Sequence, residues 1–193
     1  MAPAARRVGS DGRTLVEQKG IPVSRTTATA ATAARRRVFA MMDADGDGVV
    51  SAREYLSRVD RTVRAAGRTE DDPLVVVARA EGRKVWAEMD ADGDGKLTFD
   101  EYDAWAGAGT FDNVCRPVLG SLFDLADTDG DGALDKAEFT ALRTALNNPP
   151  GNAAAAFDAL DTDGDGRVGR DAYLASIRAF VIGDGSPMGE SLY

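Results

Sequence analysis

Aspartates recur at alternate positions in four short, glycine-containing stretches of the chain. Each stretch reads D-x-D-G-D-G over its first six residues. Carboxylates at this spacing can converge on one point inside a loop, and their oxygens and negative charge suit a hard divalent cation. The full twelve-residue stretches are DADGDGVVSARE (43–54), DADGDGKLTFDE (90–101), DTDGDGALDKAE (127–138) and DTDGDGRVGRDA (161–172).

The order of potential ligands within each stretch indicates calcium. Ca²⁺ takes about six to eight oxygens, and a twelve-residue loop supplies them from positions 1, 3, 5, 7, 9 and 12. Position 7 lends its backbone carbonyl, position 9 often holds a water, position 12 is a bidentate glutamate, and glycine at position 6 permits the turn. The predicted ligands are Asp43, Asp45, Asp47, Val49, Ser51 and Glu54 in the first loop, Asp90, Asp92, Asp94, Lys96, Thr98 and Glu101 in the second, and Asp127, Asp129, Asp131, Ala133, Asp135 and Glu138 in the third.

The fourth loop keeps only part of this ligand pattern. Asp161, Asp163 and Asp165 stand at positions 1, 3 and 5, and the carbonyl of Arg167 stands at position 7. Position 9 is a glycine and position 12 is Ala172, so the side chains that would hold the bridging water and close the coordination shell are missing. We expect a weak or vestigial metal site, which either stays empty or holds hydrated Mg²⁺.

Hydrophobic residues at fixed distances from each loop predict the helices that position it. One aromatic residue stands four positions before every loop, and another directly follows position 12. Helical spacing places them on the inner faces of an incoming and an outgoing helix, as core rather than as a cofactor site. An aliphatic residue at position 8 suits a short strand that pairs two loops. These residues are Phe39, Trp86, Phe123 and Phe157 before the loops, Tyr55, Tyr102, Phe139 and Tyr173 after them, and Val50, Leu97, Leu134 and Val168 at position 8.

Glycine and proline punctuation divides the chain into two pairs of helix–loop–helix units. We expect a basic disordered tail over 1–25, a first pair over 26–106, a joint over 107–116, a second pair over 117–182 and a C-terminal tail over 183–193. The basic tail could alternatively be a transit peptide, since it is rich in arginine and poor in acidic residues.

Local signals predict where several of these helices begin. Thr26 or Thr27 can cap the first helix, and Asp72 can cap a helix whose first residue is Pro73. Pro117 either opens the third incoming helix or lies inside a helix that starts earlier and is kinked.

Composition argues against several other functions. The chain of 193 residues has a net charge of −9, no histidine and one cysteine, Cys115, which we expect to be a core residue. Without histidine, or a base beside Cys115, catalysis and zinc binding are not expected. The acidic body disfavours nucleic acid and anionic membranes, and Arg35, Arg36 and Arg37 are expected to be a solvated helix face, or alternatively a contact for an acidic partner.

The repeated unit resembles the EF-hand over about residues 27–182, and VCRPVLGSLFDLADTDGDGALDKAEFTAL with AAAAFDALDTDGDGRV resembles bacterial calerythrin and the sarcoplasmic calcium-binding proteins. The resemblance implies an all-α fold of four EF-hands in two pairs packed into one compact globule, and a cytoplasmic calcium buffer or transporter. We further expect a monomer, and not an enzyme, because the carboxylates belong to the loops. The chain departs from that group, in which a loop near the second hand is commonly degenerate, because here the fourth loop is damaged.

A calcium sensor that regulates a protein target is the alternative to a buffer. Sensors expose methionine-rich grooves when calcium binds, but only Met41, Met42 and Met89 lie within the hands of this chain. The C-terminal segment could also fold over a hydrophobic cleft with Leu192 and Tyr193 and leave no groove for a target. These features favour the buffer.

Overall fold

The computed structural model describes the chain from Val23 to Tyr193. Most of the basic tail expected over 1–25 lies outside the described residues. Its last three residues begin helix α1, so this helix starts before Thr26, where the sequence placed its cap. Within the described range, no helix is both long and apolar enough to cross a membrane.

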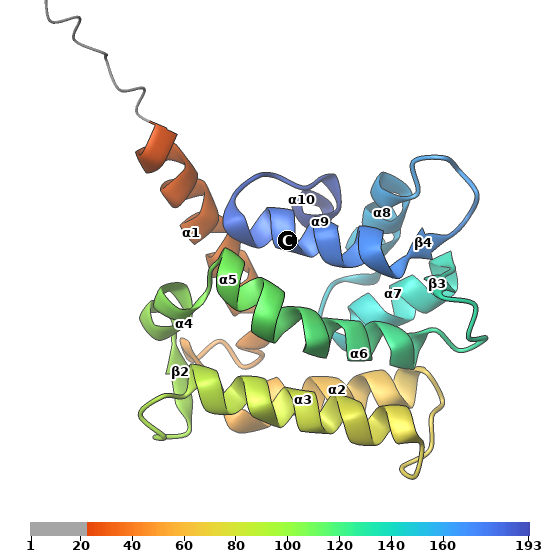
Figure 1. Ribbon diagram of the computed structural model, residues 1–193, viewed down its shortest axis with the longest axis horizontal. Coiled ribbons are helices and arrows are strands. Elements are labelled where there is room, and N and C mark those ends of the chain that lie inside the picture. The colour runs from red at the N-terminus through yellow and green to blue at the C-terminus, as the bar shows by residue number, and fades with distance from the viewer. Residues whose placement is uncertain (1–22) are drawn as a thin grey trace, which may run out of the picture.

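The first half of the chain forms two helix–loop–helix units, as predicted (Figure 1). Asp72 caps α3 and Pro73 is its first residue, in agreement with the sequence. The elements are α1 (Val23–Met42), β1 (Val49–Ser51), α2 (Ala52–Ala65), α3 (Pro73–Met89), β2 (Lys96–Thr98) and α4 (Phe99–Trp105).

The second half repeats this arrangement and adds a final short helix. Its elements are α5 (Ala108–Thr110), the π-helical segment η1 (Phe111–Cys115), α6 (Arg116–Ala126), β3 (Ala133–Leu134), α7 (Lys136–Ala145), α8 (Pro150–Leu160), β4 (Val168–Gly169), α9 (Arg170–Ile182) and α10 (Pro187–Leu192).

The stretch 107–116, expected as a joint, is helical from Ala108 onward and runs into α6. Of the two alternatives for Pro117, the earlier helix start is therefore the one observed. Proline has no N–H, and its ring would clash with the carbonyl of Asn113 in an ordinary α-helix. The wider π-helical turn at Phe111–Cys115 relieves this clash.

Two small antiparallel ribbons join the loops in pairs. Val50 lies opposite Leu97, and Leu134 lies opposite Val168. These four aliphatic side chains are at most 2% exposed. The pairing of the first loop with the second, and of the third with the fourth, follows the prediction, and it places two loops at each end of the molecule (Figure 1).

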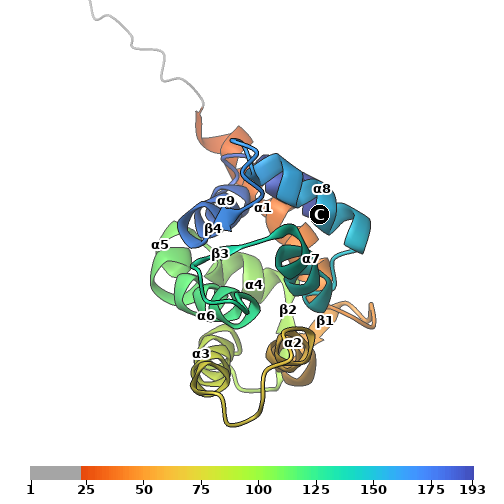
Figure 2. The ribbon, with the colours of Figure 1, turned by 90° about the vertical axis from the view of Figure 1, so that its right-hand side faces the viewer.

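The two pairs share hydrophobic core and form one compact body. All eight aromatic residues that flank the loops are buried, as predicted. Helix α3 packs on α6, α2 on α7 and α1 on α9, so each half contacts the other through several helices (Figures 1 and 2). Val59 of α2 and Val75 of α3 belong to the same buried cluster as the core of the second pair.

The C-terminal helix α10 lies against α8 and α9. Its side chains Met188 and Leu192 are buried, and the ring of Tyr193 stacks on Phe180 with 5.0 Å between centroids. Gly183 ends α9 in a left-handed conformation, which lets the chain turn back. The expected folding of this segment over a hydrophobic cleft is observed.

Candidate metal centres

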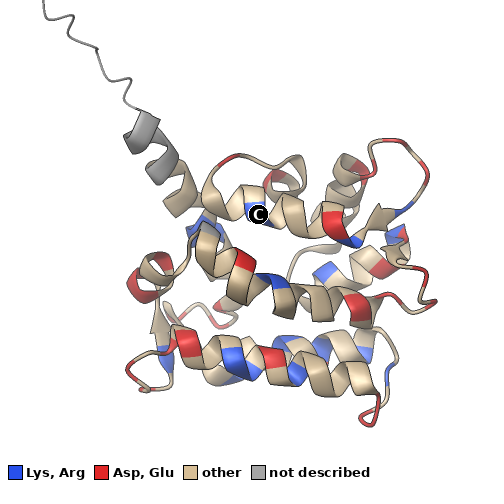
Figure 3. Cartoon of the chain, in the orientation of Figure 1, with Lys and Arg blue, Asp and Glu red and all other residues tan. Residues whose placement is uncertain are grey.

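Three acidic side chains converge in each of the four loops. The converging ligand atoms lie within 4.8 Å of one another in Asp43, Asp45 and Glu54, in Asp90, Asp92 and Asp94, in Asp127, Asp129 and Asp131, and in Asp161, Asp163 and Asp165. Acidic residues mark the loops at both ends of the molecule (Figure 3). Oxygen is the only donor in these groups, which is the preference of Ca²⁺ and Mg²⁺.

Backbone amides fix the first aspartate of the loops. In the first loop, Asp43 accepts hydrogen bonds from the amides of Gly46 and Gly48 at 2.9 and 3.0 Å. Gly48 at position 6 has a φ of +91°, which side-chain-bearing residues rarely adopt. The turn thereby holds the Asp43 carboxylate in place before any ion binds.

Residues at positions 7 and 9 lie where a loop becomes strand and then helix. The predicted carbonyl ligands Val49, Lys96 and Ala133 begin β1, β2 and β3. At position 9, Ser51, Thr98 and Asp135 are the N-caps of α2, α4 and α7, and each accepts a hydrogen bond from the amide of the position-12 glutamate. The glutamate bonds back to the cap amide, forming a capping box.

Glu54 and Glu138 also reach across their loops. Glu54 accepts from the amide of Ala44 at 2.9 Å, and Glu138 accepts from the amide of Thr128 at 2.9 Å. Among the described residues, the carboxylate of Glu101 instead accepts hydrogen bonds only from Thr98, within its capping box. In this structure the glutamates therefore close the first and third loops more fully than the second.

Hydrogen bonds keep two of the position-12 glutamates ionised. Burial alone would raise the pKa of Glu54, but the amide and hydroxyl of Ser51 and the amides of Ala44 and Asp45 outweigh it and lower that pKa. The amide and hydroxyl of Thr98 likewise lower the pKa of Glu101. Both glutamates are thus available as anionic ligands at neutral pH.

The fourth loop has the same turn but lacks the capping box. Gly169 caps α9 without a side-chain hydrogen bond, and Ala172 has no oxygen to offer. The neighbouring Asp171 does not replace it, because its carboxylate pairs with Arg116 at 2.7 Å. The Oδ1 atom of Asp161 is shielded from solvent and has no hydrogen-bond partner among the described residues. A cation in this loop would satisfy that oxygen, so the remaining aspartates still fit an ion.

A positively charged side chain from the fourth loop contacts the third loop. The guanidinium of Arg167 contacts Oδ2 of Asp131 and lies 3.9 Å from Oδ2 of Asp129. From the sequence, Arg167 is expected only to lend its backbone carbonyl to its own loop. The expected pairing of the third and fourth loops is the signal that could have revealed this contact. Because Leu134 lies opposite Val168, the side chain of Arg167 lies beside the third loop.

Helix–loop–helix units that pair through the centre of their loops, with acidic residues at positions 1, 3 and 5 of every loop and a glutamate at position 12 of three of them, define a class of divalent-cation-binding proteins. The sequence profile of the EF-hand domain pair matches residues 32–106 and 116–178. The chain belongs to the EF-hand family, and Ca²⁺ is the ion this family binds.

Solved structures resemble the chain over most of its length. A Streptomyces coelicolor calcium-binding protein is 27% identical, with a TM-score of 0.65 over 80% of this chain and 98% of that one. The coelenterazine-binding protein of Renilla muelleri is 19% identical, with a TM-score of 0.65 over 89% of this chain and 98% of that one. The photoprotein berovin of Beroe abyssicola is 24% identical, with a TM-score of 0.61 over 77% and 86%. None of the curated proteins matches this sequence.

Proposed function

We propose that this protein is an intracellular calcium buffer with three working sites, in loops 43–54, 90–101 and 127–138, and a degenerate site in loop 161–172. The three loops each supply the full ligand pattern, ending in Glu54, Glu101 and Glu138. The fourth lacks both the glutamate and its capping box. Binding rather than catalysis is the role, and a monomer suffices for it.

The position of α10 is the observation that favours a calcium buffer over a calcium sensor. A sensor needs a hydrophobic groove that becomes free for a target. Here Met188 is 0% exposed and Leu192 is 2% exposed, because α10 packs on α8 and α9. The only large hydrophobic side chains strongly exposed in the described part of the chain are Val76 and Val77. Two valines on one helix are too small a surface for a target-binding groove.

Hydrogen bonds between a buried arginine and two tyrosine hydroxyls also support a structure in which the C-terminal segment covers the hydrophobic surface. Arg143 on α7 donates to the hydroxyl of Tyr193 at 2.7 Å and to the hydroxyl of Tyr173 at 2.9 Å. Asn148 receives the third bond of this arginine and donates to the carbonyl of Leu192 at 3.1 Å. The end of the chain is thus tied to α7 and α9 by polar as well as apolar contacts.

A calcium-dependent regulator is the second candidate. The similar Streptomyces coelicolor protein is described in terms of prokaryotic calcium-mediated regulation. In this chain such a role would need α10 to leave its place when calcium binds and expose the surface that now holds Met188 and Leu192.

Calcium titration calorimetry, together with a hydrophobic dye, tests both functions. We expect three ions per chain and little change in dye fluorescence on adding calcium. The fluorescence of Trp86 provides an independent signal for ion binding in the second loop, because its indole N–H donates to Asp90 at 3.1 Å. Four tight ions would contradict the degenerate fourth site, and a large calcium-dependent rise in dye binding would favour the regulator.

A further inference from the structure

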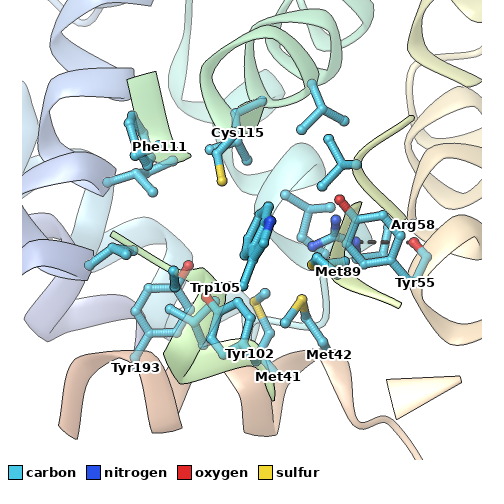
Figure 4. Close-up of a pocket in the computed structure, with 18 of the residues that line it drawn as sticks. Met41, Met42, Tyr55, Arg58, Met89, Tyr102, Trp105, Phe111, Cys115 and Tyr193 are labelled. Atoms are coloured by element: carbon cyan, nitrogen blue, oxygen red, sulfur yellow. Dashed lines mark hydrogen bonds between the residues drawn. The ribbon is translucent and has the colours of Figure 1, made fainter. Parts of the chain in front are cut away.

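The two tryptophans of the second hand lie in different surroundings. Trp105, at the end of α4, lines an apolar cavity between the two EF-hand pairs, with Met41 and Met42 on one side of its ring and Cys115 on the other (Figure 4). Trp86, in the last turn of α3, is not among the residues that line this cavity. It stands instead four residues before the second loop, where the other three hands have phenylalanine.

Among the four hands, only the second therefore has a side-chain hydrogen-bond donor at this position. The indole N–H of Trp86 donates to Oδ2 of Asp90, the first predicted ligand of the loop, at 3.1 Å. The indole ring is held in place, since Trp86 is 9% exposed and its ring lies 5.7 Å from the Tyr55 ring, centre to centre. The amide of Asp90 also donates to the carbonyl of Trp86 at 2.9 Å. Asp90 is thus fixed to Trp86 through both its backbone and its carboxylate.

The backbone supports this first aspartate less well in the second loop than in the first and third. Asp43 accepts from two glycine amides, one on each oxygen, at 2.9 and 3.0 Å. Asp127 likewise accepts from two glycine amides, at 2.8 and 2.9 Å. Among the described residues, the only backbone amide that donates to the Asp90 carboxylate is that of Gly95, at 3.2 and 3.4 Å. Without the indole, Asp90 would be held more weakly than Asp43 or Asp127.

The glutamate at the end of the second loop does not make up for this difference. Glu54 and Glu138 accept hydrogen bonds from amides at the start of their loops, at 2.9 Å in both cases. Within the described part of the chain, the carboxylate of Glu101 accepts from Thr98 alone. The second loop therefore lacks two contacts that the first and third loops have, and it has the indole bond that they lack.

We propose that Trp86 is a positioning residue of the second calcium site, and that its indole N–H holds Asp90 in the orientation that binds the ion. Oδ2 of Asp90 accepts from Trp86 and from Gly95, which leaves Oδ1 as the oxygen for the ion. Hydrogen-bonded neighbours of this kind orient metal ligands, and their loss lowers metal affinity by about 10- to 100-fold. The inference rests on the proposed calcium binding by loop 90–101.

Calorimetry in a Glu54→Gln/Glu138→Gln background, which leaves the second loop as the intact site, measures this effect. We expect Trp86→Phe, which installs the residue of the other hands, to lower the calcium affinity by about tenfold. Trp105→Phe removes the other tryptophan of this hand and should leave the affinity unchanged. An equal or higher affinity in Trp86→Phe would overturn the inference and leave the calcium function intact. No calcium binding in the background itself would overturn both.

An isosteric replacement separates the hydrogen bond from the packing of the ring. Trp86→benzothienylalanine has sulfur in place of the indole N–H, so the side chain keeps the shape of tryptophan but cannot donate. We expect this variant to weaken the second site about as much as Trp86→Phe does. Full calcium affinity with the analogue would show that packing alone supports the loop, and it would overturn the proposal.

The indole proton of Trp86 provides a test on the unaltered protein, which remains decisive even if the variants do not fold. We expect NMR spectroscopy to show that this proton exchanges with solvent much more slowly than in the unfolded chain, both in a chelator and in saturating calcium. Exchange as fast as in the unfolded chain once calcium is bound would mean that the bond to Asp90 is absent from the loaded site. That result would overturn the positioning role.

Discussion

The guanidinium of Arg167, at position 7 of the fourth loop, contacts the carboxylate of Asp131, at position 5 of the third. Asp131 uses its other oxygen, Oδ1, to accept from the amide of Ala133 at 2.9 Å. The oxygen that would face a bound ion is therefore the one that the arginine approaches. We propose that this residue of the fourth loop competes with calcium for Asp131, a predicted ligand of the third loop.

Replacing this arginine should tighten the third site. Arg167→Met removes a cation that calcium must displace or tolerate. Because the Arg167 side chain is 46% exposed, solvent screens the pair, and we expect only about a two- to fivefold gain in affinity. Calcium calorimetry in a Glu54→Gln/Glu101→Gln background, which leaves the third loop as the intact site, measures the effect.

Lys96→Met is the matched control for the change of charge. Lys96 occupies position 7 of the second loop, is exposed and forms no ion pair within the described residues. In a Glu54→Gln/Glu138→Gln background its removal should change the affinity of the second loop less than Arg167→Met changes that of the third. Equal gains in both loops would mean that general charge, and not the contact with Asp131, sets the affinity.

Restoring the missing glutamate should create a fourth site. In Ala172→Glu the new carboxylate stands at position 12, where the other loops have theirs, and the unpartnered Oδ1 of Asp161 gains a cation. We expect the calorimetric stoichiometry to rise by one ion. Ala172→Gln has a similar size but only one neutral oxygen and should bind far more weakly. A stoichiometry that stays unchanged in the glutamate variant would show that Gly169 or Arg167 prevents binding as well.

The sequence predicted the features of this protein that depend on local spacing. The D-x-D-G-D-G turns, the aromatic flanks and the aliphatic residue at position 8 each depend on residues close together in the chain. Such residues have nearly the same surroundings in every EF-hand, so the pairing of Val50 with Leu97 could be predicted from the sequence alone. The ligand assignments stay predictions until ions are counted.

Features that depend on how the two pairs pack could not be read in this way. Arg35 was expected on a solvated helix face, yet it pairs with Asp103 at 3.1 Å and donates to the carbonyl of Val181 at 3.2 Å. Both partners are distant in sequence and are brought close because α1 lies against α4 and α9. The same packing, rather than any motif, creates the cavity beside Trp105.

The packing of α10 can be tested at one glycine. A Cβ atom on Gly189 would lie 2.5 Å from the ring of Phe180, and such a contact requires the helix or the ring to shift. We expect Gly189→Ala to lower the free energy of unfolding by about 1–3 kcal/mol, as overpacking does. It should also increase dye binding, because α10 is displaced from the surface that it covers. Thermal unfolding in saturating calcium measures the first effect.

Gly151→Ala provides the comparison within a helix. A Cβ atom at Gly151, in the first turn of α8, would have no neighbour within 4 Å. Alanine is favoured over glycine in helices by about 0.5–1 kcal/mol, so this variant should be neutral or slightly more stable. Unchanged dye binding in both variants would mean that α10 is not what keeps the surface covered.

Calcium removal should destabilise the whole fold. Ligands that bind only the folded state stabilise it by about 2.7 kcal/mol per independent site at a hundredfold excess over Kd. Each ion also neutralises carboxylates that repel one another because their ligand atoms lie within 4.8 Å. We expect a marked fall in Tm when a chelator replaces calcium, and a partial fall in Glu138→Gln. A Tm independent of calcium would contradict working sites.

The thiol of Cys115 should report how tightly the two pairs are packed. Burial raises the pKa of this thiol to about 12, with Arg58 acting in the opposite direction and Glu88 adding to the rise. Because the thiolate is the reactive form, a raised pKa leaves only about one thiol in ten thousand ionised at pH 8. Alkylation of the calcium-loaded protein at pH 8 should therefore be much slower than alkylation of the unfolded chain. The rate should rise when a chelator loosens the contact between the pairs, since Cys115 lies in the cavity they share. If the calcium-loaded protein reacts as fast as the unfolded chain, the cavity is open to solvent and the burial of Cys115 does not hold in solution.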